Sequence, residues 1–450
     1  MQTPDNQESD IQGSAAVSSS VEREGSAAVS SSVERESSAA ASPPVEPEDF
    51  AAVSFPVKHK GFAAVSLAVE PEDSAAALPE SERTSAAEVS ETPPLQSSHG
   101  SSQRVSWIDT AKGITMFLVF FGHLNATWFP ALASTIGAIF LFHMPAFFVL
   151  SGIFFRPEMS FPHLVKHRAW QLLVPYYIFS ALLLGQTLGK DVLPAFYAGR
   201  PGRQGTLWQD VVAIIFNTTD GLWFLCSLFT ASLLLWCIVR VCGERFLIPI
   251  ALVLLVADAA VRHVLTRPLP FTLNQVLSST AYLALGFACR KVLLALTRRR
   301  AALLTLICAP IFLCLAWLST LPLVNARWTL TWTVSILASL FGTGMLLGLS
   351  RLLPVLRPVT FVGRSTLIYY SLNDIMLKVC KLVVFKLVPV ASASLPAFGQ
   401  FAEGLFVVLL AMALVGLLVP LLKRYLWWTV GLSGPQRKSR RTGVAASRRA

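Results

Sequence analysis

Hydrophobic and polar positions change their pattern near residue 104. From there to about residue 425, apolar runs close to 20 residues long alternate with short polar segments. A helix of about 20 apolar residues crosses the roughly 30 Å of hydrocarbon in a bilayer. The pattern predicts about ten membrane-spanning helices, at residues 107–126, 135–155, 169–189, 222–241, 245–262, 272–296, 302–320, 329–349, 363–388 and 401–424. Alternating segments typical of a membrane β-barrel are absent from the sequence, so we expect an all-α, polytopic membrane protein.

The first hundred residues follow a different pattern, a tandem repeat. The segment GSAAVSSSVERE at residues 13–24 recurs unchanged at 25–36, and degraded copies continue the twelve-residue period, so that six copies fill residues 13–84. Short units of Ala, Ser, Glu and Pro bury too little apolar surface to offset the entropy of ordering them. We therefore expect residues 1–100 to be a disordered tail. The alternative is that the tail docks a partner, through its aromatic residues Phe50, Phe55 and Phe62.

Composition supports a membrane domain and changes how the charge is interpreted. The chain is 54% hydrophobic and 14% charged, whereas soluble proteins have about 25% charged residues. A net charge of +11 could indicate nucleic-acid binding, but the basic residues flank the apolar runs, as the positive-inside rule expects. With a cytoplasmic N-terminus, twelve Lys and Arg fall in inside loops and six in outside loops. We therefore expect both termini to be cytoplasmic, with residues 426–450 as a basic tail beside anionic lipid.

Three ionisable residues interrupt the first predicted span: Asp109, Lys112 and His123. Such residues are costly in a bilayer and indicate function by default. A step of eleven residues turns a helix by about 1100°, so Lys112 and His123 share one face about 16 Å apart, and Asp109 can pair with Lys112. A cation can hold an anionic cytoplasmic cofactor while an imidazole farther along deprotonates a hydroxyl. The alternative is a snorkelling lysine and a histidine bonded to a backbone carbonyl.

The second predicted span carries a further intramembrane histidine. Its sequence FLFHMPAFFVLSGIFFR places His143 among aromatic residues and Arg156 at the cytoplasmic exit. Ser151 and Gly152 lie between them, and small residues of this kind allow another helix to approach closely.

Several of these blocks resemble the acyltransferase 3 superfamily of integral membrane O-acyltransferases. RVSWIDTAKGITMFLVFFGH is similar to its opening signature, a basic residue followed by ten residues and a histidine, here Lys112 and His123. FHMPAFFVLSG resembles the second block, whereas GLWFLCSLF and FVGRSTLIYYSLND resemble weaker later blocks. The resemblance covers residues 104 to about 425 and is nearest to the sugar and exopolysaccharide O-acetyltransferase branch.

Two positions depart from the family pattern. Where the late block normally has histidine, this chain has Asn373, or Asp374 after a shift of one residue. That position is therefore either not catalytic here or has lost its proton-transfer role. Lys112 stands where many members have arginine, and lysine keeps the charge but not the bidentate fork that binds phosphate.

The resemblance implies transfer of an acyl group, in the first place acetyl from cytoplasmic acetyl-CoA, to a sugar hydroxyl. The acceptor would be an exopolysaccharide, another cell-surface glycan or a lipid-linked oligosaccharide at a bacterial inner membrane, with polysaccharide assembly proteins as possible partners. No metal is expected. The candidate catalytic residues are His123 and Asp109. The candidates for binding the donor are Lys112, Arg156, Arg168 and Arg364, and those for binding the acceptor are His143, Trp223 and Asn373. For Trp223, an ordinary position at the membrane interface is the alternative to stacking on a sugar.

Two other classes of function compete with the enzyme. A transporter or exporter of a lipid-linked sugar or polysaccharide often has an internal repeat of spans, and we find no matching halves in this sequence. A membrane anchor that serves only the repeat tail would leave the intramembrane Asp, Lys and His without a purpose. The sequence therefore favours the enzyme.

Overall fold

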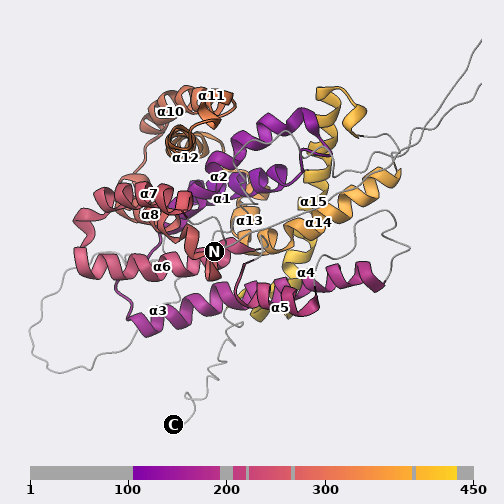
Figure 1. Cartoon of the computed structure of the whole chain (residues 1–450), viewed down its shortest axis with the longest axis horizontal. Coiled ribbons are helices and arrows are strands. Elements are labelled where there is room, and N and C mark those ends of the chain that lie inside the picture. Colours follow the sequence, from indigo (N-terminus) through magenta and orange to yellow (C-terminus); the bar gives the residue numbers. More distant parts are fainter. Residues whose placement is uncertain (1–104, 193–205, 219–221, 265–268, 388–391, 433–450) are drawn as a thin grey trace, which may run out of the picture. The chain divides into compact units, whose positions relative to one another are not determined.

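The computed structural model describes residues 105–192, 206–218, 222–264, 269–387 and 392–432. Within these residues all regular secondary structure is helical, which confirms the all-α prediction (Figure 1). The expectations for the repeat tail at residues 1–100, and for the basic tail beyond residue 432, fall outside the described residues.

Each predicted span corresponds to a helix. These helices are α1 (Ser106–Gly122), α2 (Ala133–Gly152), α4 (Val174–Val192), α6 (Trp223–Cys242), α7 (Leu247–Val264), α8 (Val276–Ala288), α10 (Arg298–Leu318), α12 (Trp328–Leu352), α14 (Thr366–Leu387) and α15 (Ala397–Tyr425). Among the described residues, six helical segments are long and apolar enough to cross a membrane, those of α2, α6, α7, α10, α12 and α15. They support a multi-pass membrane protein. Ten crossings stay a prediction, because α1, α4, α8 and α14 are not among these six, and α1 and α8 have only 17 and 13 residues.

Several short helices join the long ones, and of these only α9 (Arg290–Leu294) lies within a predicted span, 272–296. The others are α3 (Phe161–Arg168), α5 (Leu207–Ile215), α11 (Pro322–Asn325) and α13 (Arg357–Gly363). Proline occupies the first turn of α3, α11 and α13, where its fixed φ suits a helix start. A capping box between Thr206 and Gln209 begins α5. A search for bilayer-length apolar runs does not detect helices of this length.

Two glycines let α2 and α8 pack backbone to backbone. A Cβ added at Gly152 of α2 would collide with the carbonyl oxygen of Leu283 in α8, and one at Gly286 of α8 would collide with that of Val149 in α2. The close approach expected at Ser151 and Gly152 is therefore confirmed, and α8 is the partner.

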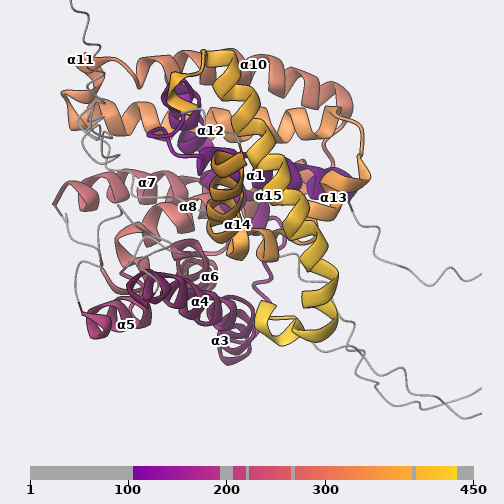
Figure 2. The same cartoon turned by 90° about the vertical axis from the view of Figure 1, so that its right-hand side faces the viewer.

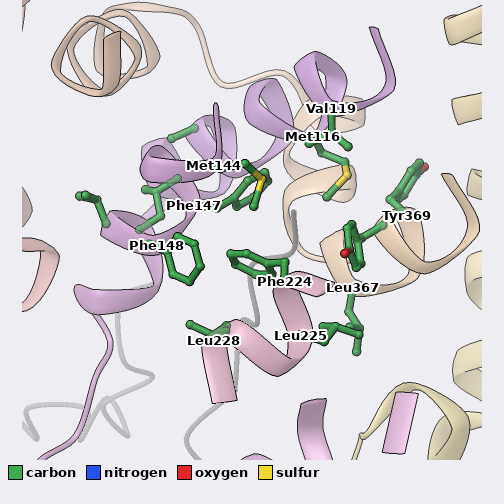
Figure 3. Close-up of a cluster of buried hydrophobic side chains, with 14 of the residues drawn as sticks. Met116, Val119, Met144, Phe147, Phe148, Phe224, Leu225, Leu228, Leu367 and Tyr369 are labelled. Atoms are coloured by element: carbon green, nitrogen blue, oxygen red, sulfur yellow. The ribbon is translucent and has the colours of Figure 1, made fainter. Parts of the chain in front are cut away.

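The buried core joins α1, α2, α6 and α14. Figure 3 shows side chains from these helices facing one another, among them Met116, Phe147, Phe224 and Tyr369. By contrast, α10 and α12 lie side by side in both views (Figure 1, Figure 2), and of the 21 residues of α10 only Ala301, Cys308 and Phe312 are buried. The helix α1, which carries the ionisable residues, is therefore part of the buried core, whereas α10 is largely exposed.

Candidate active site

His123 is the C-cap of α1 and presents one ring nitrogen for chemistry. Its Nδ1 lies 2.8 Å from the carbonyl oxygen of Val119. A carbonyl only accepts hydrogen bonds, so Nδ1 carries the proton and Nε2 of the neutral ring has the free lone pair. The bond to a backbone carbonyl, which was the structural alternative for this residue, is present. It fixes the tautomer that a general base needs, so the two interpretations are compatible.

The ring of Phe140 from α2 contacts both histidines of the candidate site. The Phe140 and His123 rings meet edge-on with centroids 6.0 Å apart, and the Phe140 and His143 centroids are 5.4 Å apart. His143 is fully buried, with Nδ1 2.7 Å from the carbonyl oxygen of Ile139. The structure thus brings the two intramembrane histidines together around one aromatic ring.

The late block of the sequence also reaches His123. Asp374 and Lys381 of α14 are charged groups within electrostatic range of the imidazole, and the Lys381 ammonium lies 3.5 Å from the carbonyl oxygen of Leu124. Asp374 is half-exposed and pairs with Lys378 at 2.6 Å. Asn373 is buried, and its Oδ1 has no hydrogen-bond partner among the described residues. Of the two candidates for the missing histidine, Asp374 is therefore the one whose charge acts on His123.

Asp109 forms its ion pair with Arg364, not with the lysine three residues away. The Arg364 Nε lies 2.9 Å from Asp109 Oδ2. A Cβ at Gly363 would collide with the carbonyl oxygen of Asp109, and one at Gly113 would collide with that of Val359. The two glycines therefore let α13 approach α1 closely enough to place Arg364 beside the carboxylate. The i, i+3 spacing pointed to Lys112, and the ion pair that the structure shows for Asp109 is with Arg364, 255 residues away in sequence.

Asp109 and His123 lie at opposite ends of α1. Fourteen residues separate them, which corresponds to about 21 Å along the helix. The geometry therefore does not place Asp109 at the same reacting atoms as His123. Its carboxylate positions the Arg364 guanidinium, whose side chain is 44% exposed while that of Asp109 is 7% exposed.

The other cations predicted to bind the donor are Lys112, Arg156 and Arg168. Lys112 is buried, and its Nζ lies 4.8 Å from the ring centroid of Phe154, two residues before the exposed Arg156. Arg168 ends α3, and its Nε has no hydrogen-bond partner among the described residues. Burial lowers the pKa of Arg168 to about 10, so the guanidinium stays charged at neutral pH.

His167 belongs to the same basic cluster and was missed in the sequence. Its pKa is lowered first by burial and then by the neighbouring charges of Arg168, His163 and Arg156. The rings of His163 and His167 are stacked, with centroids 6.1 Å apart. The run HLVKHR was a possible signal, but it lies in a short helix that we had treated as a loop.

Trp223 is placed in the core. It is the first residue of α6, is 3% exposed, and meets Phe224 edge-on with ring centroids 6.1 Å apart. Its expected role in stacking on a sugar stays a prediction. Within the described residues, no three His, Cys, Asp or Glu side chains are grouped so that they could hold a metal ion.

The sequence model of a known acyltransferase domain matches residues 105–425. The chain belongs to the acyltransferase 3 family. The match extends from the start of α1 to the end of α15, so the whole helical domain is the acyltransferase domain. Comparisons with curated proteins and with solved structures gave no match. The protein is therefore a membrane acyltransferase.

Proposed function

We propose that this acyltransferase moves an acetyl group from acetyl-CoA to a sugar hydroxyl in an exopolysaccharide or other cell-surface glycan. We further propose that it does so in a bacterial inner membrane, with both termini in the cytoplasm. The observation that carries the proposal is the division of chemistry along α1. Cations gather at the Asp109 end, and an imidazole with an available Nε2 lies at the His123 end.

The Asp109 end suits an anionic donor. Coenzyme A carries phosphates, and guanidinium and ammonium groups bind phosphate by charge-assisted hydrogen bonds. Arg364 is half-exposed, and the ammonium of Lys423 lies 2.9 Å from Ser365 Oγ, next to it in sequence. Arg156 and Arg168 both act electrostatically on His167. The long pantetheine arm of the donor would then carry the thioester toward His123.

The His123 end suits proton transfer. Nε2 takes the proton of the sugar hydroxyl while that oxygen attacks the thioester carbonyl carbon. The new C–O bond forms, the C–S bond breaks, and the departing thiolate takes the proton back from the imidazolium. A positioned general base contributes about 10²–10⁴-fold, and the negative charge of Asp374, which Lys381 opposes, would favour the transient imidazolium.

Replacement of the base tests the proposal. His123→Gln should remove surface-glycan acetylation in cells that express the full chain at the wild-type level, as measured by mass spectrometry of the isolated polysaccharide. Thr127→Ser, a conservative change four residues away at an exposed position, is the matched control and should leave acetylation intact. Persistent acetylation in His123→Gln would show that the base is elsewhere. Loss of exported glycan, with no acetyl group on the wild-type product, would support an exporter instead.

A further inference from the structure

A second polar cluster lies in a pocket between α2, α7, α8 and α12, apart from the residues assigned above. It is lined by apolar and aromatic side chains together with a few polar groups, including Phe140, Asp258, Arg262, Ser278, Tyr282 and Trp332. Sites for small organic ligands typically combine apolar walls with a small number of convergent polar groups. The composition of this pocket is therefore that of a ligand site.

An ion pair supplies the charged groups that line the pocket. Arg262 Nε lies 2.7 Å from Asp258 Oδ2, and both side chains are largely buried. Arg262 also donates to Ser278 Oγ at 3.2 Å, and the Ser278 backbone N–H donates to Asp258 Oδ1 at 3.2 Å. A buried ion pair contributes little net stability. An ionisable pair kept inside apolar helices therefore indicates a role in binding.

Hydroxyl groups and an indole complete the pocket. The Tyr282 hydroxyl is hydrogen-bonded to Ser339 Oγ, and Ser279 Oγ lies 2.6 Å from Ser227 Oγ. The Arg262 guanidinium lies 5.5 Å from the ring centroid of Trp332. A pyranose presents hydroxyls around its rim and C–H groups on its faces, so paired charges, hydroxyls and an aromatic ring match it. Coenzyme A does not fit, because Asp258 neutralises Arg262.

Phe140 connects this pocket to the general base. Its side chain lines the pocket and its ring also meets the His123 ring edge-on. The same side chain therefore borders both the pocket and the imidazole of His123. We infer that the pocket binds a neutral pyranose of the acyl acceptor, stacked on Trp332 and hydrogen-bonded to Asp258 and Arg262. This inference rests on the proposed function for the identity of the ligand as acceptor.

The test measures binding directly, without acyl transfer. The full chain in lipid nanodiscs is heated with the methyl pyranosides of glucose, galactose and mannose, and the shift in Tm is recorded. At least one glycoside should raise the Tm of the wild type. Trp332→Ala should weaken the apparent affinity about tenfold, which corresponds to about 1.4 kcal/mol. Trp317→Ala, at a 62% exposed tryptophan of α10, is the control and should bind like the wild type.

A second variant fills the pocket instead of removing a contact. Ser335→Phe adds a ring at a half-buried lining position, and should abolish the glycoside-induced shift while the shift caused by acetyl-CoA persists. Acetyl-CoA also shows that each variant is folded. The pocket is overturned if no glycoside shifts the Tm of the wild type. It is also overturned if Trp332→Ala and Ser335→Phe show the same glycoside-induced Tm shift as the wild type. Glycoside binding that depends on Trp332, in a protein that transfers no acetyl group, refutes the proposed function and leaves the sugar pocket.

Discussion

The two ends of α1 carry different electrostatics, although one helix joins them. At the Asp109 end, Arg364 pairs with the buried carboxylate and Lys112 lies one turn farther along the helix, with its ammonium near the ring of Phe154. At the His123 end, Asp374 pairs with Lys378 and acts on the imidazole together with Lys381 of opposite sign. Asp258 pairs with Arg262 in the pocket that Phe140 also lines. An excess of cations favours a polyanion, whereas paired charges and hydroxyls favour a neutral polyhydroxyl ligand. The Asp109 end of α1 therefore suits an anionic donor, and the His123 end suits a neutral acceptor.

The largest effect on stability and donor binding is expected from disrupting the backbone contact between α1 and α13 at the Asp109 end. Gly363→Leu forces a side chain into the Asp109 carbonyl. Overpacking of this kind costs about 1–3 kcal/mol or more, and it separates Arg364 from Asp109. We expect a lower Tm of the purified protein and loss of acetyl-CoA binding, measured by ligand-induced Tm shifts.

Gly137→Ala is the control for that change, because a Cβ there meets nothing within 4 Å. It should leave both Tm and binding unchanged. A wild-type Tm for Gly363→Leu would show that the close contact between α1 and α13 is absent.

A substitution in the Asp109–Arg364 pair distinguishes two roles of the carboxylate, an effect of its charge on donor binding and the positioning of the Arg364 guanidinium. Asp109→Asn makes the cluster more positive, so a purely electrostatic site would bind acetyl-CoA more tightly. If the carboxylate positions the guanidinium, the KM for acetyl-CoA should instead rise, by about tenfold for the loss of a charged hydrogen bond. Steady-state kinetics in nanodiscs checks this, with Glu244→Gln, which weakens the exposed Arg290–Glu244 pair, as the control.

Asp374 should matter to the reaction and not to binding. Asp374→Asn removes a carboxylate whose charge acts on His123, and we expect kcat to fall about tenfold with the KM of both substrates within twofold of wild type. Lys378→Met breaks the ion pair of Asp374 but keeps the carboxylate, so its kcat should stay near that of the wild type. Equal losses in the two variants would assign the pair a structural role.

The smallest expected effect is a pH dependence of donor binding. Burial and the nearby cations lower the pKa of His167, so its imidazole is neutral at pH 7. A bound polyanion favours the protonated ring, and binding should then take up a proton. The affinity for acetyl-CoA should therefore rise a few-fold as the pH falls from about 7 to about 5.5.

Calorimetry in buffers of different ionisation enthalpy measures that proton uptake. His167→Gln should bind acetyl-CoA with a weaker dependence on pH, and His263→Gln, whose ring stacks on Trp328, should behave like the wild type. The same pH dependence in His167→Gln would place the titrating group elsewhere.

Much of the helical order could be predicted, because bilayer-length apolar runs are a strong signal in one dimension. The ten long helices lie close to the expected ranges, and the close-packing role of Ser151 and Gly152 followed from residue size alone. The short helices α3 and α13 could not be found in this way. As a result, His167 was overlooked, and Asp109 was assigned to a neighbour on its own helix.

The sequence by itself determined the class of protein and the two chemical groups of α1, because the eleven-residue step between Lys112 and His123 is a property of the helix. Only the tertiary structure decided their partners. Gly363 and Gly113 bring Arg364 to Asp109, the charge of Asp374 on α14 acts on His123, and α2, α8 and α12 complete the pocket that Asp258 and Arg262 of α7 line. Helix periodicity fixes which residues share a face, but the backbone contact that small residues permit selects the helix that packs against that face.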